Sequence, residues 1–293
     1  MILPRWVLTA SVAVLVALLG AGCVAPEEID DLSYDRRFSD TVLDLYLPDD
    51  DGSAHAAVMF VHGGGWQYGD KRAFRTAARR LARSGYVAAN INYRLAPEGE
   101  FPRACQDVAC ALAFLQVNAA EYHVDPARIA VLGYSAGGHL VSLLGVAWDH
   151  EELAPDCDAG TPAPPAAVIP GAGVHDLRGA DHAWVEEFMG GSEAQVPERY
   201  RLASPILHVD AGEPPFLLIS GGADWIVEVD QSRDMRAVLR AAGNHAELLT
   251  MAGSGHLVQP SADPGELHIG VSLDTPEAWL AIADFLERTL GGP

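Results

Sequence analysis

Basic residues are scarce in this chain. Its 293 residues include 19 Lys and Arg against 40 Asp and Glu, which gives a formal net charge of -21 at pH 7. A surface this acidic repels phosphate backbones and anionic lipid headgroups. We therefore expect no nucleic-acid partner, and any membrane attachment has to be covalent or hydrophobic.

Cysteine is also rare, and its spacing argues against a metal site. The four Cys and eleven His residues form no C-x-x-C or H-x-x-x-H pair, the spacings typical of metal ligands. Cys105 and Cys110 fall on a predicted helix, where five residues correspond to about 140° of rotation, so their thiols point away from each other. Either one could pair with Cys157, and the spacing leaves both pairings open.

A long uncharged run occurs at the N-terminus. After Arg5, residues 6–22 carry no charge over about 17 positions and end in small residues. This form is typical of an export signal, which predicts a signal peptide over 1–22 and a linker over 23–31. The alternative is a retained anchor, for which the run is at the lower limit of length. Export would place the remaining cysteines where disulfides form.

The end of this segment resembles a lipobox. Leu19-Gly-Ala-Gly-Cys23 is similar to the processing site of bacterial lipoproteins, although Gly20 stands where that motif prefers Leu or another branched apolar residue. The resemblance implies lipid attachment at Cys23 and an exported protein held on a membrane, since two or more acyl chains give stable anchoring. Without acylation, cleavage would release the protein into the periplasm or the extracellular space.

Apolar strands and helical segments alternate along the rest of the chain. Strict alternation indicates parallel strands joined by crossover helices. No internal repeat or second compositional zone occurs, so we predict a single α/β domain over 32–293. The predicted strands cover 42–47, 57–61, 87–93, 129–133, 167–169, 216–220 and 246–250, and the predicted helices cover 71–84, 103–118, 137–148, 229–242 and 276–290.

A candidate nucleophile lies between a predicted strand and a predicted helix. Gly133-Tyr-Ser135-Ala-Gly137 fits G-x-S-x-G, and in this context the serine sits on a sharp turn that exposes its hydroxyl. The glycines permit the turn because a Cβ would clash there. The alternative is a serine that only caps the helix.

Successive glycines follow an earlier strand. His62-Gly63-Gly64-Gly65-Trp66 comes directly after the strand that ends at Val61. The N–H groups of such a backbone can turn toward a substrate oxygen, and together with the N–H of Ala136 at a helix N-terminus they would form an oxyanion hole. The alternative is an ordinary flexible turn.

The acid and the base are expected to follow Ser135 in that order, each after a strand. Asp224 follows the strand at 216–220, and His256 follows the strand at 246–250. The three residues then share the edge where open α/β sheets hold their active sites. His245 lies at the wrong edge, His268 lies deep in a long loop, Asp230 and Asp234 lie on a solvated helix, and Asp176 is the reserve acid.

Six motifs, in this order, resemble the α/β-hydrolase superfamily, and most closely its secreted feruloyl-esterase-like and hormone-sensitive-lipase-like carboxylesterases. The resemblance implies a mostly parallel sheet of about eight strands with helices on both faces, Ser135 as nucleophile, His256 as base, Asp224 as acid, and Gly64, Gly65 and Ala136 as oxyanion donors. Many relatives carry Asp at the position of Tyr134, and this difference affects only the polarity of the pocket. The motifs are His62–Trp66, Tyr93–Glu98, Asp125–Ile129, Gly133–His139, Ala203–Ile206 and Gly222–Asp224.

Two irregular regions bear on substrate choice. The segment 174–212 contains Trp184, Phe188, Met189 and Tyr200, which either pack under a long loop or line a substrate pocket. The loop 257–274 after the predicted base is long enough to reshape the substrate mouth.

The predicted activity is hydrolysis of a small or carbohydrate-linked ester through an acyl-enzyme, without metal or organic cofactor. An arylformamidase or peptidase with the same triad is the first alternative. A catalytically idle, membrane-tethered binding module is the second.

Overall fold

The computed structural model describes residues 26–256, 259–260, 267–268, 273 and 275–293. The predicted signal peptide, Cys23 and most of the loop 257–274 lie outside the described residues.

An eight-stranded sheet forms the centre of the molecule, in the order β1-β2-β4-β3-β5-β6-β7-β8. β1 and β2 pair antiparallel, as do β2 and β4, and every later pair is parallel. The predicted α/β-hydrolase fold with a mostly parallel sheet is confirmed. The strands are β1 (Glu27–Ser33), β2 (Val42–Leu47), β3 (His55–Val61), β4 (Val87–Ile91), β5 (Val124–Tyr134), β6 (Ala167–Gly171), β7 (Phe216–Gly221) and β8 (Ala246–Met251), and β9 (Gln259–Pro260) pairs with β10 (Leu267–His268) in a separate ribbon.

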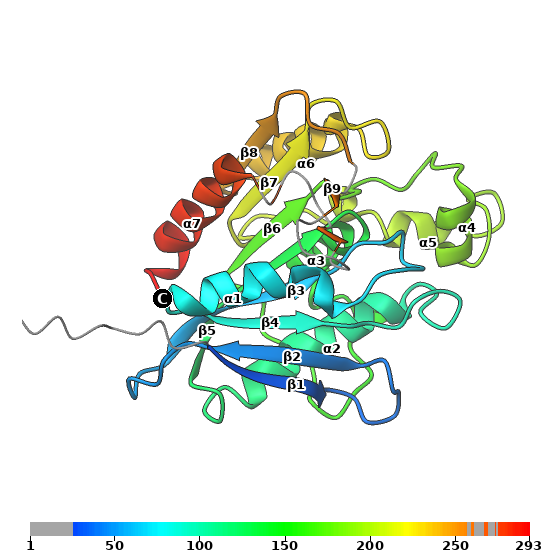
Figure 1. Cartoon of the computed structure of the whole chain (residues 1–293). Helices are drawn as coiled ribbons and strands as arrows, with labels where there is room; N and C mark the ends of the chain where they lie inside the picture. Colours follow the sequence, from blue (N-terminus) through cyan, green and yellow to red (C-terminus); the bar gives the residue numbers. More distant parts are fainter. Residues whose placement is uncertain (1–25, 257–258, 261–266, 269–272, 274) are drawn as a thin grey trace, which may run out of the picture.

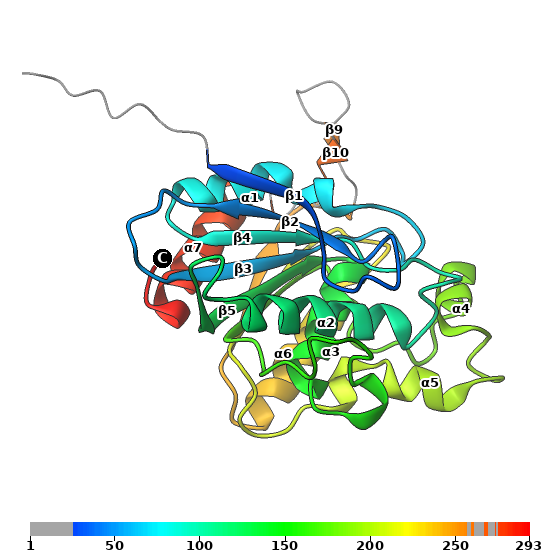
Figure 2. The same cartoon turned by 90° about the horizontal axis from the view of Figure 1, so that it is seen from below.

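Helices cover both faces of the sheet and divide the core in two. α1 and α7 pack on one face, and α2, α3 and α6 pack on the other (Figure 2). α4 and α5 lie beyond the carboxyl ends of the central strands (Figure 1). The helices are α1 (Arg75–Arg83), α2 (Arg103–Val117), α3 (Ala136–Ala147), α4 (Ala183–Met189), α5 (Pro197–Leu202), α6 (Val229–Ala241) and α7 (Pro276–Leu290), with short 3₁₀ turns η1 (Lys71–Phe74), η2 (Glu151–Leu153) and η3 (Pro205–Leu207).

One predicted boundary is wrong at the N-terminal side. The linker predicted over 23–31 overlaps β1, whose backbone pairs with β2 from Glu27↔Leu47 to Ser33↔Val42. β1 is an acidic and largely exposed edge strand, so backbone pairing holds it in place without a buried apolar run. The domain therefore begins before residue 32.

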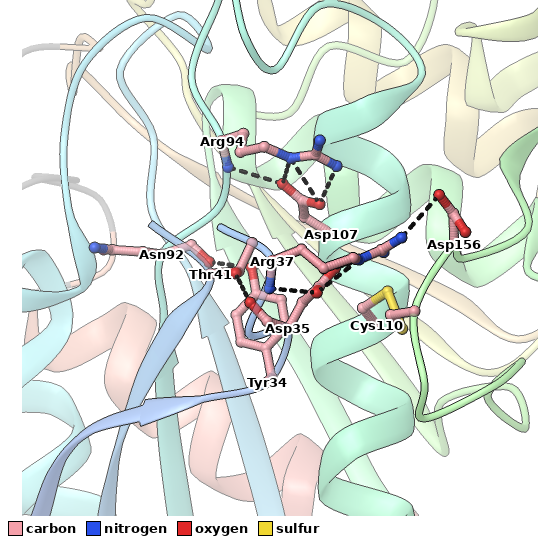
Figure 3. Close-up of a disulfide and its surroundings, with 10 residues drawn as sticks. Tyr34, Asp35, Arg37, Thr41, Asn92, Arg94, Asp107, Cys110 and Asp156 are labelled. Atoms are coloured by element: carbon pink, nitrogen blue, oxygen red, sulfur yellow. Dashed lines mark hydrogen bonds and ion pairs between the residues drawn. A yellow bond between two sulfur atoms is a disulfide. The ribbon is translucent and has the colours of Figure 1, made fainter. Parts of the chain in front are cut away.

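The structure resolves the cysteine pairing that the sequence left open. Cys110 on α2 forms a disulfide with Cys157, across a sequence separation of 47 residues and a Cα–Cα distance of 6.1 Å. Cys105 is buried as a free thiol. Beside the disulfide, Arg37 bridges Asp35 and Asp156, with Nη1–Oδ2 3.1 Å to the latter (Figure 3). The loop that carries Cys157 is thus tied both to α2 and to the segment before β2.

Among the described helices, none combines the length and the apolar character that a membrane span requires. Within the same described ranges, no three His, Cys, Asp or Glu side chains gather in a way that could hold a metal ion.

Candidate active site

Ser135 occupies a strained turn between β5 and α3. Its backbone has φ 54° and ψ -118°, a positive φ that is uncommon outside glycine and typical of functional turns. Gly137 is required for this turn, because an added Cβ would lie 2.0 Å from the Val61 carbonyl oxygen. The Ser135 side chain makes no capping hydrogen bond to α3, so the helix-cap interpretation does not apply.

The hydroxyl of Ser135 is directed at an imidazole instead. The Oγ of Ser135 lies 2.9 Å from the Nε2 of His256, and the Nδ1 of His256 lies 2.7 Å from the Oδ2 of Asp224. Because a carboxylate only accepts, the Nδ1–H of His256 donates to Asp224. Its Nε2 is then the free acceptor that faces the Ser135 hydroxyl.

Backbone hydrogen bonds hold the Asp224 carboxylate in place independently of its contact with the imidazole. Its side chain is fully buried, and its Oδ1 accepts the backbone N–H groups of Ile226 and Val227, each at 3.0 Å. Two backbone donors hold one carboxylate oxygen in place and leave the other for His256. The structure therefore brings together the three side chains that the sequence placed after β5, β7 and β8.

The alternative residues lie elsewhere. Asp176 forms an ion pair with Arg178 at 2.7 Å. His245 precedes β8 and pairs with Glu247 on the exposed surface, and Asp230 and Asp234 are exposed on α6. The side chain of His268 lies outside the described residues.

The glycine loop lies directly against the nucleophile turn. A Cβ added to Gly63 would lie 2.7 Å from the carbonyl oxygen of Tyr134 and 3.2 Å from the Cβ of Ser135. Within the described part of the chain, the N–H groups of Gly64, Gly65 and Ala136 donate no hydrogen bond. These three amides are available to a substrate oxygen beside Ser135.

Buried rings hold this loop in shape. Tyr93 stacks on His62 at 4.4 Å between ring centroids and donates its hydroxyl to the His62 carbonyl oxygen at 3.0 Å. Burial lowers the pKa of His62 to about 4, so the ring is neutral and its Nδ1–H donates to Gly63 at 2.8 Å. Trp66 is anchored by its Nε1–H, which donates to Nδ1 of the buried His139 at 3.2 Å.

The aromatic cluster of the 174–212 segment divides into two parts. Phe188, Met189 and Tyr200 are fully buried, and Phe188 stacks on Trp66 at 4.5 Å, so these three are packing residues. Trp184 on α4 is only half-buried. Its Cε3 lies 3.8 Å from the position of a Cβ on Gly65, which places this ring beside the candidate oxyanion loop.

One contact of this site could not be predicted from the sequence. The hydroxyl of Tyr134 donates to the backbone carbonyl oxygen of His256 at 3.0 Å, across 122 residues of sequence. The two rings are 5.3 Å apart. The local sequence does not indicate this bond, because Tyr134 has the pattern of a further apolar residue at the end of a buried strand.

Comparisons with known proteins agree with the fold. The family model BD-FAE matches residues 43–239. The chain is similar to esterase LipC of Mycobacterium tuberculosis, with 33% identity over 73% of this chain and 56% of that protein. It thus spans about half the length of the curated relatives that it matches.

Solved structures show the same similarity. A truncated carbohydrate esterase from gut microbiota superposes with a TM-score of 0.79 and 25% identity, covering 91% of this chain and 98% of that one. A thermophilic esterase from the Planctomycetes species Thermogutta terrifontis gives a TM-score of 0.72 and 26% identity, covering 91% and 93%. With a family model that matches most of its length, the chain belongs to the BD-FAE family of α/β-hydrolases.

Proposed function

We propose that this protein is a serine carboxylic-ester hydrolase. The observation that carries the proposal is the 2.9 Å contact between Ser135 Oγ and His256 Nε2, on an imidazole whose other nitrogen donates to Asp224. A serine hydroxyl is a weak nucleophile until a positioned base takes its proton. This arrangement supplies that base in the required tautomer.

The reaction follows from this arrangement. His256 takes the proton of Ser135 as Oγ attacks the ester carbonyl carbon, and the protonated imidazole then gives that proton to the departing alcohol oxygen. Water, deprotonated by the same imidazole, hydrolyses the acyl-enzyme. The buried carboxylate of Asp224 stabilises the imidazolium, and the N–H groups of Gly64, Gly65 and Ala136 stabilise the oxyanion.

The substrate is proposed to be a small or carbohydrate-linked ester. The relatives above are named esterases and carboxylic ester hydrolases, and one structural neighbour is a carbohydrate esterase. The Thermogutta terrifontis esterase has been solved with propionate and with butyrate bound. These names support short acyl groups as the first series to assay.

Covalent labelling tests the nucleophile directly. The Thermogutta terrifontis esterase is phosphorylated by paraoxon, so a fluorophosphonate probe should label this protein and fail on Ser135→Ala. Ser142→Ala is the matched control, because the Ser142 hydroxyl donates to Gly138 within α3. Activity on p-nitrophenyl esters should fall by several orders of magnitude in Ser135→Ala, and adding His256→Ala should cost little more. Strictly additive losses would contradict a triad that acts as a unit.

Amide hydrolysis and an idle binding module are the alternatives. Peptide and N-formyl substrates, assayed beside the ester panel, would identify a peptidase or an arylformamidase by a higher kcat/KM. A protein that neither hydrolyses esters nor takes the probe would be an idle module.

We propose in addition that the exported chain is anchored through a lipid on Cys23. Metabolic labelling with a palmitate analogue should mark the wild type and fail for Cys23→Ser. Equal labelling of the wild type and of Cys23→Ser would contradict the proposal.

A further inference from the structure

We propose that Tyr134, the residue immediately before the nucleophile, is a positioning residue for the His256 imidazole. The inference rests on the proposed function, since it assigns His256 as the base. The Tyr134 hydroxyl bonds to the backbone oxygen of His256 and not to its imidazole. It acts by fixing the backbone from which the imidazole projects.

The bond is partly buried. Tyr134 is only 1% exposed, and its hydroxyl donates to the carbonyl oxygen of the partly exposed His256 at 3.0 Å. A hydrogen bond partly shielded from water is stronger than one on the open surface, and its loss leaves the carbonyl without that donor. The Tyr134 hydroxyl therefore restrains the peptide group of His256 itself.

This restraint adds a third fixed point to the base. The imidazole is held at Nδ1 by Asp224 and faces Ser135 at Nε2. Both of those contacts act on the ring and not on the backbone of His256. The bond to the carbonyl oxygen restrains the backbone of the same residue, and in this proposal it helps to maintain the separation of Nε2 from Oγ.

The register of the sheet explains why residue 134 can reach the base. Tyr134 is the last residue of β5 and pairs with Gly171 of β6. A Cβ on Gly171 would lie 3.0 Å from the Tyr134 ring and 3.2 Å from Leu273, so a glycine at this position leaves the ring its room. The same strand end thus carries the nucleophile at 135 and, through residue 134, a contact to the base.

Tyr134→Phe tests the inference by deleting one oxygen atom. We expect kcat on a p-nitrophenyl ester to fall about fivefold to tenfold, equal to roughly 1–1.4 kcal/mol of barrier, with KM changed less than twofold. The second-order rate of fluorophosphonate labelling should fall by the same factor, because it reports activation of Ser135 without a substrate alcohol.

Tyr34→Phe is the matched control. Tyr34 is also buried, and its hydroxyl donates at 2.6 Å to the backbone oxygen of Asn92, which follows β4 and not one of the strands that carry the triad (Figure 3). Both variants should lose similar stability in urea, but Tyr34→Phe should retain kcat and the labelling rate within twofold. Equal kinetic losses in the two variants, or no kinetic loss in Tyr134→Phe, would overturn the assignment.

A double-mutant cycle with Asp224→Asn separates positioning of the imidazole from a general effect on the fold. If Tyr134 acts through His256, its hydroxyl matters little once Asp224→Asn has already misoriented the ring. Tyr134→Phe should then cost less than twofold in the Asp224→Asn background. A full additional loss would show that Tyr134 acts elsewhere. Failure of the proposed function has a different signature, namely activity that survives Ser135→Ala.

Discussion

Three buried histidines should make the folded state sensitive to mild acid. His62, His139 and His175 are at most 1% exposed, and burial lowers the pKa of His62 and His139 to about 4 and that of His175 to about 3. In the unfolded chain the pKa of these imidazoles is about 6.5. The unfolded state therefore binds more protons than the native state at pH values from 6.5 down to 4, and stability falls as the pH falls through that window.

The size of the effect follows from these pKa values. At pH 7 all three rings are mostly neutral in both states, whereas at pH 5 they are charged only in the unfolded state. Each ring then destabilises the native state by about 2 kcal/mol, and the three together by about 5–6 kcal/mol. A typical domain has only about 5–15 kcal/mol of stability. The raised pKa of buried Asp107, caused by desolvation, acts in the opposite direction and reduces the total.

Urea unfolding at pH 7 and pH 5 measures the loss of free energy, and calorimetry in buffers of different ionisation enthalpy measures proton uptake. We expect uptake of about three protons on unfolding at pH 5. His175→Leu should remove about one of them. Uptake below one proton would refute the view that these rings stay neutral in the native state.

Two further predictions concern the disulfide and the pocket. Cys110→Ser should lower the free energy of unfolding by about 4 kcal/mol, the value that the chain-entropy description gives for a loop of this length, whereas Cys105→Ser removes no bridge. A loss below about 1 kcal/mol for Cys110→Ser in urea would contradict that description. Trp184→Ala should reduce kcat/KM about tenfold more for p-nitrophenyl butyrate than for p-nitrophenyl acetate, because the ring lies beside Gly65, where a longer acyl group can contact it. An equal loss for both esters would assign Trp184 a structural role only.

Much of the fold could be predicted because parallel strands are buried on both faces. Every residue of His55–Val61 and of Phe216–Gly221 is buried, so each reads as a continuous apolar run. The placement of Asp224 and His256 then required the expected chain order of nucleophile, acid and base, together with the rule that parallel strands end at one edge. No side-chain geometry was needed for that step.

The missed elements lack such a signal. β1 has the sequence EEIDDLS and is mostly exposed, so its pairing with β2 depends on backbone hydrogen bonds that no side-chain pattern records. α4 and α5 have seven and six residues, too few for helical periodicity to emerge, and tertiary contacts such as Phe101 N–H to Phe188 O hold them in place. The choice of Cys110 over Cys105 also depended on the path of a loop.

The base is held by strands other than the one that carries it. His256 follows β8 in the chain, but its imidazole is bound by Asp224 after β7 and its carbonyl oxygen by Tyr134 on β5. Tyr134 ends β5 and Ser135 directly follows it in the turn before α3, so the nucleophile and the anchor of the base are joined by a single peptide bond. We therefore expect a displacement of this strand end to move both together. The second position of G-x-S-x-G, which the family resemblance links only to pocket polarity, carries Tyr134 and so provides this contact to the base.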